Sequence, residues 1–200
     1  EMGRMGLPVP PGFTISTKVC EIFYKDKKKL NSKLISQIKK ELKVIEKDVS
    51  KKFGDLKNPL LLSVRSGARV SMPGMMDTIL NLGLNDKTVI ALANKTSNAR
   101  FAKDSYRRFI QMYGSVVLGI ESYHFEELIE NYKLTKGVLL DTDLDEEDWS
   151  GLIKDFKNLV KEKTNKEFPQ DVNQQLLGAI SSVFLSWESN RAKVYRKLNQ

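Results

Sequence analysis

Residues 60–78 read LLLSVRSGARVSMPGMMDT, and this stretch decides how the fold is interpreted. The run from Leu60 to Val64, which follows Pro59, is almost continuously apolar, as is typical of a short β-strand covered on both faces. Such a strand would place Arg65 at its C-terminal end. Residues 66–78 combine small side chains with three methionines and show no helical period, so they predict a loop. Ligands commonly bind where strands end in such loops, and we therefore expect a ligand site here.

Arg65 suits a ligand that carries phosphate groups. An arginine fork can pair with two phosphate oxygens through charge-assisted hydrogen bonds, each of which contributes about 1.5–3 kcal/mol. The small residues beside it would let backbone amides approach a polyphosphate. An arginine at a strand end can equally hold a carboxylate of a neighbouring element, so the residues alone leave both roles open.

The chain changes character near residue 84. Five of its six prolines and seven of its twelve glycines precede that position, whereas beyond it Pro169 is the only proline and apolar residues recur at helical spacing. We therefore predict an α+β fold, with a turn-rich lobe first and a helical one after it. In the first lobe the β-branched stretch 14–17 predicts a short strand. From Asn31 onward an apolar stripe predicts a helix that ends at Gly54 in a left-handed cap. The stripe consists of Leu34, Ile38, Leu42, Ile45, Val49 and Phe53.

The region beyond residue 84 predicts four amphipathic helices whose apolar faces form a core. These faces comprise Phe101, Ala102, Ser105, Phe109, Met112 and Val116; Phe125, Leu128, Ile129 and Tyr132; Trp149, Ile153, Phe156 and Val160; and Val172, Leu176, Ile180, Val183 and Trp187. Gly114, Gly137 and the Phe168–Pro169 step mark the expected breaks between helices.

The charge of the chain invites a nucleic-acid interpretation, which its distribution does not favour. The net charge is +8, from 33 Lys and Arg against 25 Asp and Glu. The lysines of residues 25–29 and 33–52 have no aromatic residues interleaved for base stacking, so we expect a solvated face and no nucleic-acid partner. The sequence has no apolar run of about 18 residues, which predicts no membrane span. Because the sequence begins at Glu1 without a secretory leader, we expect a cytoplasmic protein that is part of a longer chain.

Two other groups of residues contain side chains that can bind metals or react. One cysteine, Cys20, and one histidine, His124, exclude a disulfide framework and the usual zinc sites. His124 lies in an aromatic and acidic helix start, which favours a structural or surface role. The acidic run 141–148 resembles a calcium loop but has Glu146 where the turn needs glycine and Leu152 where the closing glutamate belongs. We expect its carboxylates to cap the helix that carries Trp149.

At residues 60–86 the sequence resembles the pyruvate phosphate dikinase family. The string LLLSVRSGARVSMPGMMDTILNLGLND is similar to that family's nucleotide-domain signature, and RFAKDSYRRFIQMYG at 100–114 is similar to a second one. The stretches 6–17, 168–184 and 186–199 also fit, so the resemblance covers nearly the whole chain. Related phosphoenolpyruvate synthases share the Pro-Gly-Phe and Val-Arg-Ser strings but differ in the loop 71–77.

The resemblance implies part of an ATP-grasp nucleotide-binding lobe with a mostly helical insertion. It divides the chain into 1–84 for the first part of the lobe, 85–170 for the insertion and 171–200 for a helical return. It also implies a phosphotransferase that interconverts ATP, phosphate and pyruvate with AMP, pyrophosphate and phosphoenolpyruvate through a phosphohistidine on another domain. The other implied partners are ATP, the rest of the parent chain, and further copies of a homo-oligomeric parent enzyme. Mg²⁺ is the implied cofactor, with ligands outside these residues, and the segment alone should be inactive.

The resemblance assigns Arg65 to the arginine that contacts ATP phosphates. The matching loop should also approach the nucleotide, and its candidate ATP- and phosphate-binding residues are Arg69, Ser71, Gly74, Met75, Met76, Asp77 and Thr78. No residue of the segment is expected to be catalytic or to bind the metal. Arg107 and Arg108 in the insertion form either surface ion pairs, which we favour, or a docking point for a mobile domain.

Two functions of other classes stay open on the sequence. One is a basic nucleic-acid-binding domain, which would bind DNA or RNA with a steep dependence on salt. The other is a helical docking module, which would form a stable complex with another protein without ATP.

Overall fold

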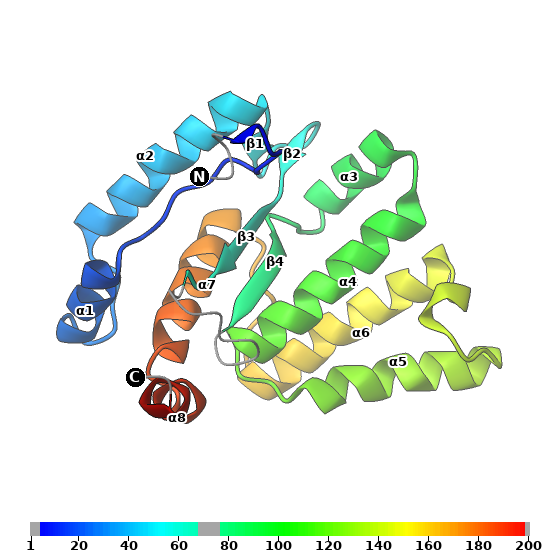
Figure 1. Cartoon of the computed structure of the whole chain (residues 1–200). Helices are drawn as coiled ribbons and strands as arrows, with labels where there is room; N and C mark the ends of the chain where they lie inside the picture. The colour runs from blue at the N-terminus through cyan, green and yellow to red at the C-terminus, as the bar shows by residue number, and fades with distance from the viewer. Residues whose placement is uncertain (1–4, 68–76, 199–200) are drawn as a thin grey trace. The chain divides into compact units, whose positions relative to one another are not determined.

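The computed structural model describes residues 5–67 and 77–198, which form an α+β fold (Figure 1). The chain divides into two compact units, Glu1–Lys52 and Phe53–Gln200. No helix among the described residues is both long and apolar enough to cross a membrane.

The first unit contains α1 (Thr17–Lys25) and α2 (Ser32–Val49). The predicted start of α2 is confirmed, since the Asn31 side chain caps it by accepting a hydrogen bond from the Leu34 amide at 2.9 Å. Its end differs from the prediction. The left-handed cap is Ser50, with φ of 52°, and not Gly54. The helix ends one turn earlier than predicted because Phe53 belongs to the strand that follows it.

The predicted strand at residues 14–17 is wrong. Ser16 is the N-cap of α1, Thr17 is its first residue, and residues 14–15 have no regular structure. Strand preference of β-branched residues expresses their packing on a pleated surface beside a partner strand. No strand among the described residues pairs with this stretch, so its β-branched side chains lack the partner strand that would stabilise an extended conformation.

The second unit contains most of the sheet structure. β1 (Lys52–Phe53) pairs with β2 (Pro59–Leu60), and β3 (Leu62–Arg65) pairs antiparallel with β4 (Thr78–Leu82). Arg65 is the last residue of β3, as predicted. The expectation that this strand is covered on both faces is wrong for the described residues, because Leu62 and Val64 are partly covered while Ser63 and Arg65 are exposed. One face is covered because α7 (Val172–Ser186) packs on both strands and α4 (Ala99–Val116) packs on β4 (Figure 1).

A bulge in β4 sets the register of this sheet. Leu62 lies opposite Leu82 and Val64 opposite Ile79, so two steps along β3 match three along β4. Asn81 takes up the extra residue with a φ of 59°. Ile79 and Leu82 are therefore both fully buried although a regular strand would turn residues three apart to opposite faces. Beyond the bulge, Arg65 lies opposite Thr78.

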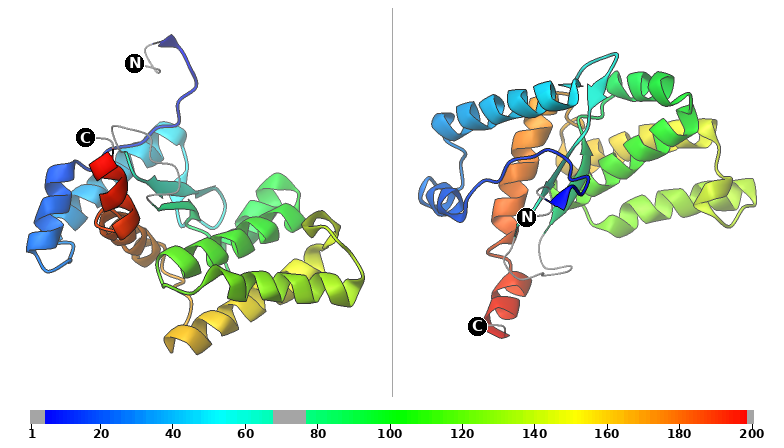
Figure 2. Two further views of the ribbon diagram at one scale, coloured as in Figure 1. Left: turned by 60° about the horizontal axis from the view of Figure 1, so that its bottom comes forward. Right: turned by 45° about the horizontal axis from the view of Figure 1, so that its top comes forward.

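The remaining helices of the described residues follow in chain order. They are α3 (Thr88–Thr96), α5 (Ser122–Lys136), α6 (Glu146–Thr164) and α8 (Asn190–Leu198), with a 3-10 turn, η2 (Asp141–Asp143), before α6. α4 packs on α3 and α6, and α5 packs on α6; Figure 2 shows these helices side by side. The four predicted helices are thus confirmed as α4, α5, α6 and α7. Phe101 departs from its predicted face and is 49% exposed.

The predicted breaks are confirmed at two of three places. Gly137 ends α5 with a φ of 70°, and Phe168–Pro169 lies between α6 and α7. Gly114 is not a break, since it lies inside α4. A Cβ atom at Gly114 would lie 2.6 Å from Cζ of Phe125, so this glycine lets α5 approach α4 closely.

Candidate functional site

Arg65 and Thr78 form the centre of the candidate site, on the open face of the β3–β4 sheet. They occupy directly opposite positions of the antiparallel ladder, and opposite residues direct their side chains to the same face. Both are exposed, as is Ser63 two residues earlier on β3. The covered face of the sheet carries Ile79 and Leu82 instead. The strand ends therefore present a cation and a hydroxyl side by side on an uncovered surface.

The Arg65 guanidinium forms no ion pair or side-chain hydrogen bond with any residue in 5–67 or 77–198. The sequence left open whether this arginine holds a neighbouring carboxylate. Within the part of the chain that the structure describes, no carboxylate takes that place.

Asp77 and Ser186 tie the start of β4 to the end of α7. The Asp77 amide donates to Oγ of Ser186 at 3.4 Å, and Oγ of Ser186 donates to the Val183 carbonyl oxygen at 2.8 Å. Ser186 is buried. The residue that precedes Thr78 is thereby held by a helix on the covered side of the sheet.

The other predicted site residues, Arg69, Ser71, Gly74, Met75 and Met76, lie outside the described residues. Of the eight candidates, the structure brings Arg65, Asp77 and Thr78 together at one end of the β3–β4 sheet.

Gln175, near the start of α7, is a second anchor that the sequence analysis missed. It is fully buried, its Nε2 donates to the carbonyl oxygens of Leu84 (2.9 Å) and Pro169 (2.8 Å), and its Oε1 accepts from the Gly83 amide at 3.2 Å. A signal for it exists in the sequence. Gln175, Ser182 and Ser186 are polar residues on a helix that is otherwise apolar at buried positions, and buried polar side chains require partners.

The two arginines of α4 have different environments. Arg107 is buried, and its Nε and Nη2 pair with Asp104 (2.9 Å) and Asp141 (3.0 Å). Its guanidinium also stacks on the ring of Trp149, 4.4 Å from the centroid. Arg108 is exposed and pairs with Asp104 at 3.1 Å. The surface ion pair that we favoured is thus present at Arg108, whereas the ion pairs of Arg107 are buried and join α4 to the segment before α6.

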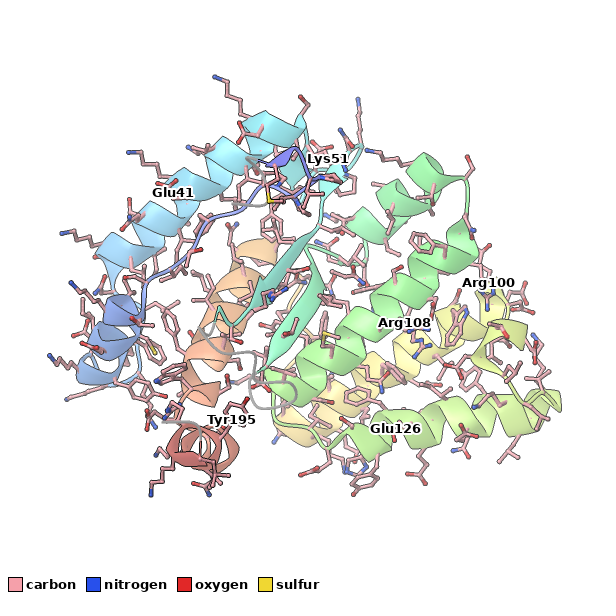
Figure 3. The ribbon with its side chains drawn as sticks, in the orientation of Figure 1. Glu41, Lys51, Arg100, Arg108, Glu126 and Tyr195 are labelled. Carbon is pink, nitrogen blue, oxygen red and sulfur yellow. The ribbon has the colours of Figure 1, made fainter. Side chains whose placement is uncertain are left out.

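Arg100 fixes the same segment from the start of α4 (Figure 3). Its Nε donates to the Leu144 carbonyl oxygen at 2.7 Å, and its Nη2 donates to those of Asp141 (3.1 Å) and Thr142 (2.8 Å). The acidic run therefore has a structural role in the loop between α5 and α6.

The predicted capping role of the acidic run is confirmed. Asp145 is the N-cap of α6, and its Oδ1 accepts from the amides of Glu147 (2.8 Å) and Asp148 (3.1 Å). The hydrogen bond from Lys136 and these amides lower the pKa of Asp145 to about 2. No group of three or more His, Cys, Asp or Glu residues among those described is arranged to hold a metal ion.

A surface hollow beside α6 is a weaker candidate. Its lining residues are Asp86, Lys154, Lys157, Asn158, Glu167, Phe168 and Gln170. The Asp86 carboxylate already accepts from Nζ of Lys157 at 2.9 Å and from the buried Tyr106 hydroxyl, also at 2.9 Å. The charge of Asp86 is thus neutralised within the protein, and Lys154 is an exposed lysine of the lining without an ion pair to a described residue.

Comparison with known proteins shows the family of the chain. A model of the family described as pyruvate phosphate dikinase, AMP/ATP-binding domain, matches residues 27–200. The pyruvate, phosphate dikinase of Clostridium symbiosum is 52% identical over 200 residues, which is all of this chain and 23% of that protein. The chloroplastic pyruvate, phosphate dikinase of Flaveria pringlei is 52% identical over 200 residues, and the pyruvate, phosphate dikinase of Entamoeba histolytica is 50% identical over 196. Those two alignments cover 100% and 98% of this chain.

The chain spans about a fifth of the length of these curated relatives, between 21% and 23%. The match of the family model covers most of the chain and includes β3, β4 and α7, the elements that carry the candidate site. The chain belongs to the pyruvate phosphate dikinase AMP/ATP-binding domain family.

Proposed function

We propose that this chain is the ATP-holding part of a pyruvate phosphate dikinase in which Arg65 binds the polyphosphate of the nucleotide. The whole enzyme would interconvert ATP, phosphate and pyruvate with AMP, pyrophosphate and phosphoenolpyruvate. The phosphoryl group would pass through a histidine on another domain, and His124 is not that histidine. In this proposal the described residues bind and orient the nucleotide and carry no group that reacts.

One observation carries the proposal. Arg65 is an exposed arginine at a strand end, opposite the Thr78 hydroxyl and without an ion pair among the described residues. A guanidinium without an ion pair can donate hydrogen bonds from two of its nitrogens to phosphate oxygens. Its positive charge can also offset the negative charge that develops when a terminal phosphoryl group leaves. Arg69, Ser71, Gly74, Met75 and Met76 remain candidate contacts on the strength of the sequence resemblance.

Mg²⁺ has no ligand set among the described residues, so the proposal places its ligands elsewhere in the parent polypeptide. A cytoplasmic location and a homo-oligomeric parent enzyme remain predictions from the sequence.

The test is a titration of ATP into the full-length polypeptide that carries this segment. Arg65→Ala should weaken ATP binding by about 10- to 100-fold, because two charge-assisted hydrogen bonds are lost. Arg108→Ala is the matched control, since it removes the same charge from an exposed arginine of the same unit. Equal ATP affinities of the wild type and a folded Arg65→Ala variant would refute the role of Arg65. Equal losses of ATP affinity in Arg65→Ala and Arg108→Ala would show that Arg65 acts only through the overall charge of the protein.

A further inference from the structure

The helix α7 holds β4 at both ends. Oγ of Ser186, at the last residue of α7, accepts from the Asp77 amide directly before β4. Oε1 of Gln175, near the first turn of α7, accepts from the Gly83 amide directly after β4. The helix and the strand therefore run in opposite directions along one another, and Figure 2 shows α7 beside the β3–β4 pair.

The distance between the two anchoring residues on α7 is close to the distance between the two amides that they hold. Gln175 and Ser186 are eleven residues apart on a helix, which corresponds to about 16 Å. Asp77 and Gly83 are six residues apart along a strand, which corresponds to about 20 Å before the bulge at Asn81 shortens it. A rigid helix can thus fix both ends of β4 without distorting either element.

The anchor at Ser186 lies next to the candidate site. The Asp77 amide that it holds is one residue from Thr78, and Thr78 is the register partner of Arg65. A shift of β4 by one residue would turn Thr78 to the covered face and place a different residue opposite Arg65. The hydroxyl of Ser186 is therefore in a position to decide what the open face presents beside the arginine.

We propose that Ser186 is a positioning residue for the nucleotide site, with Gln175 as its counterpart at the far end of β4. This inference rests on the proposed function for its ligand, ATP. Ser186 does not touch the nucleotide; it holds the Asp77 amide on the covered side, so that the first residue of β4 and Arg65 keep the relative positions that the polyphosphate requires.

Another serine on α7 provides a matched control. Oγ of Ser182, one turn before Ser186, is also buried and donates to the Val116 carbonyl oxygen at the end of α4, at 3.0 Å. Ser182→Ala and Ser186→Ala therefore each remove one buried hydroxyl from the same helix. Only the second removes a contact to the strand that carries Thr78.

The experiment compares ATP affinity and amide hydrogen exchange in the full-length polypeptide. Ser186→Ala should weaken ATP binding by about two- to tenfold, as expected for the loss of one neutral hydrogen bond, and should speed exchange in residues 77–80. Ser186→Thr, which keeps the hydroxyl, should restore both properties. Ser182→Ala should leave both within a factor of two of the wild type, even where it lowers the melting temperature.

The outcomes separate this inference from the proposed function. ATP affinity unchanged in Ser186→Ala, or lowered equally in Ser182→Ala, would overturn the positioning role. An Arg65→Ala variant measured alongside tests the ligand assignment. If Arg65→Ala bound ATP like the wild type while Ser186→Ala sped exchange and lost affinity, the role of Arg65 would be refuted, and Ser186 would position the start of β4 for the nucleotide without the arginine.

Discussion

At the scale of single residues, burial separates the arginines of the second unit. Arg107 is 4% exposed and bound to two carboxylates and an aromatic ring, whereas Arg65 is exposed and has no ion pair among the described residues. The contacts of Arg107 stabilise the fold, whereas the guanidinium of Arg65 keeps two nitrogens available to donate hydrogen bonds to a ligand.

Arg107→Ala should therefore destabilise the fold, by about 2–3 kcal/mol, because it leaves Asp104 and Asp141 without their buried partner and uncovers Trp149. Arg108→Ala, whose side chain is 59% exposed, should cost less than about 1 kcal/mol. Urea denaturation of the two variants measures the difference. Similar midpoints would show that burial of Arg107 contributes little.

Gly114 lies where α4 and α5 come close together, so a larger side chain at this position should destabilise the fold. Gly114→Ala adds a Cβ atom 2.6 Å from Cζ of the fully buried Phe125, so one of the two helices must move. We expect a loss of about 1–3 kcal/mol in the free energy of unfolding, despite the better helix propensity of alanine. Gly12→Ala is the control, since no atom lies within 4 Å of its added Cβ. A stabilised Gly114→Ala variant would contradict the close approach of α4 and α5.

At the scale of elements, α6 depends on its cap. Asp145→Ala should lower the melting temperature at pH 7, because two amides of the first turn lose their acceptor. Asp145→Asn should retain most of this stability, since asparagine also caps helices.

The pH dependence of this cap follows from the lowered pKa. The pKa of Asp145 is about 2 in the folded chain, below its ordinary value of 3.8, so the unfolded chain binds the proton more readily. The stabilisation from the charged form is therefore complete above about pH 5 and is lost as the pH falls toward 2. Thermal unfolding between pH 2 and 6 should show a smaller pH dependence for Asp145→Asn than for the wild type. Identical pH dependence would refute the contribution of the Asp145 charge.

The elements also show how much of the fold the sequence could predict. The helices α4, α5, α6 and α7 follow from apolar spacing, which is a local property. The strand β4 was missed because its bulge at Asn81 places Ile79 and Leu82 on one face, a spacing that fits neither a regular strand nor a loop. Gly114 was misread because its role depends on Phe125, which belongs to another helix.

The candidate site was predictable to a similar extent. Arg65 was identified because a short apolar strand leads directly to it. Thr78 was assigned to a loop, whereas it begins β4 and lies opposite Arg65. Ser186 was missed because its partner, Asp77, lies 109 residues away, and no local pattern reveals such a contact.

At the scale of the whole chain, the net positive charge lies almost entirely in the first unit. Residues 1–52 contain 13 Lys and Arg and 6 Asp and Glu, so they hold seven of the eight net positive charges. On α2, Lys39, Lys43 and Lys47 are exposed and follow one another at intervals of four residues. Like charges at this spacing repel one another on a helix.

Replacement of these three lysines by glutamine should leave the fold intact and raise its stability slightly at low salt, by up to about 0.5 kcal/mol per repelling pair. The gain should vanish in 0.5 M salt. Thermal unfolding at the two salt concentrations measures it, with Glu41→Gln as a control that should not stabilise. A large loss of stability would contradict the expectation of a solvated face, and a salt-steep affinity for DNA that the triple variant loses would contradict the expectation of no nucleic-acid partner.

The central claim is that Arg65, on the open face of the β3–β4 sheet, holds the phosphates of the nucleotide. The most direct measurement compares the affinities for ATP and adenosine in the full-length polypeptide, with and without Arg65→Ala. We predict that the variant loses about 10- to 100-fold in affinity for ATP and less than twofold for adenosine, which has no phosphate. Equal losses for both ligands, or none for ATP, would contradict the claim.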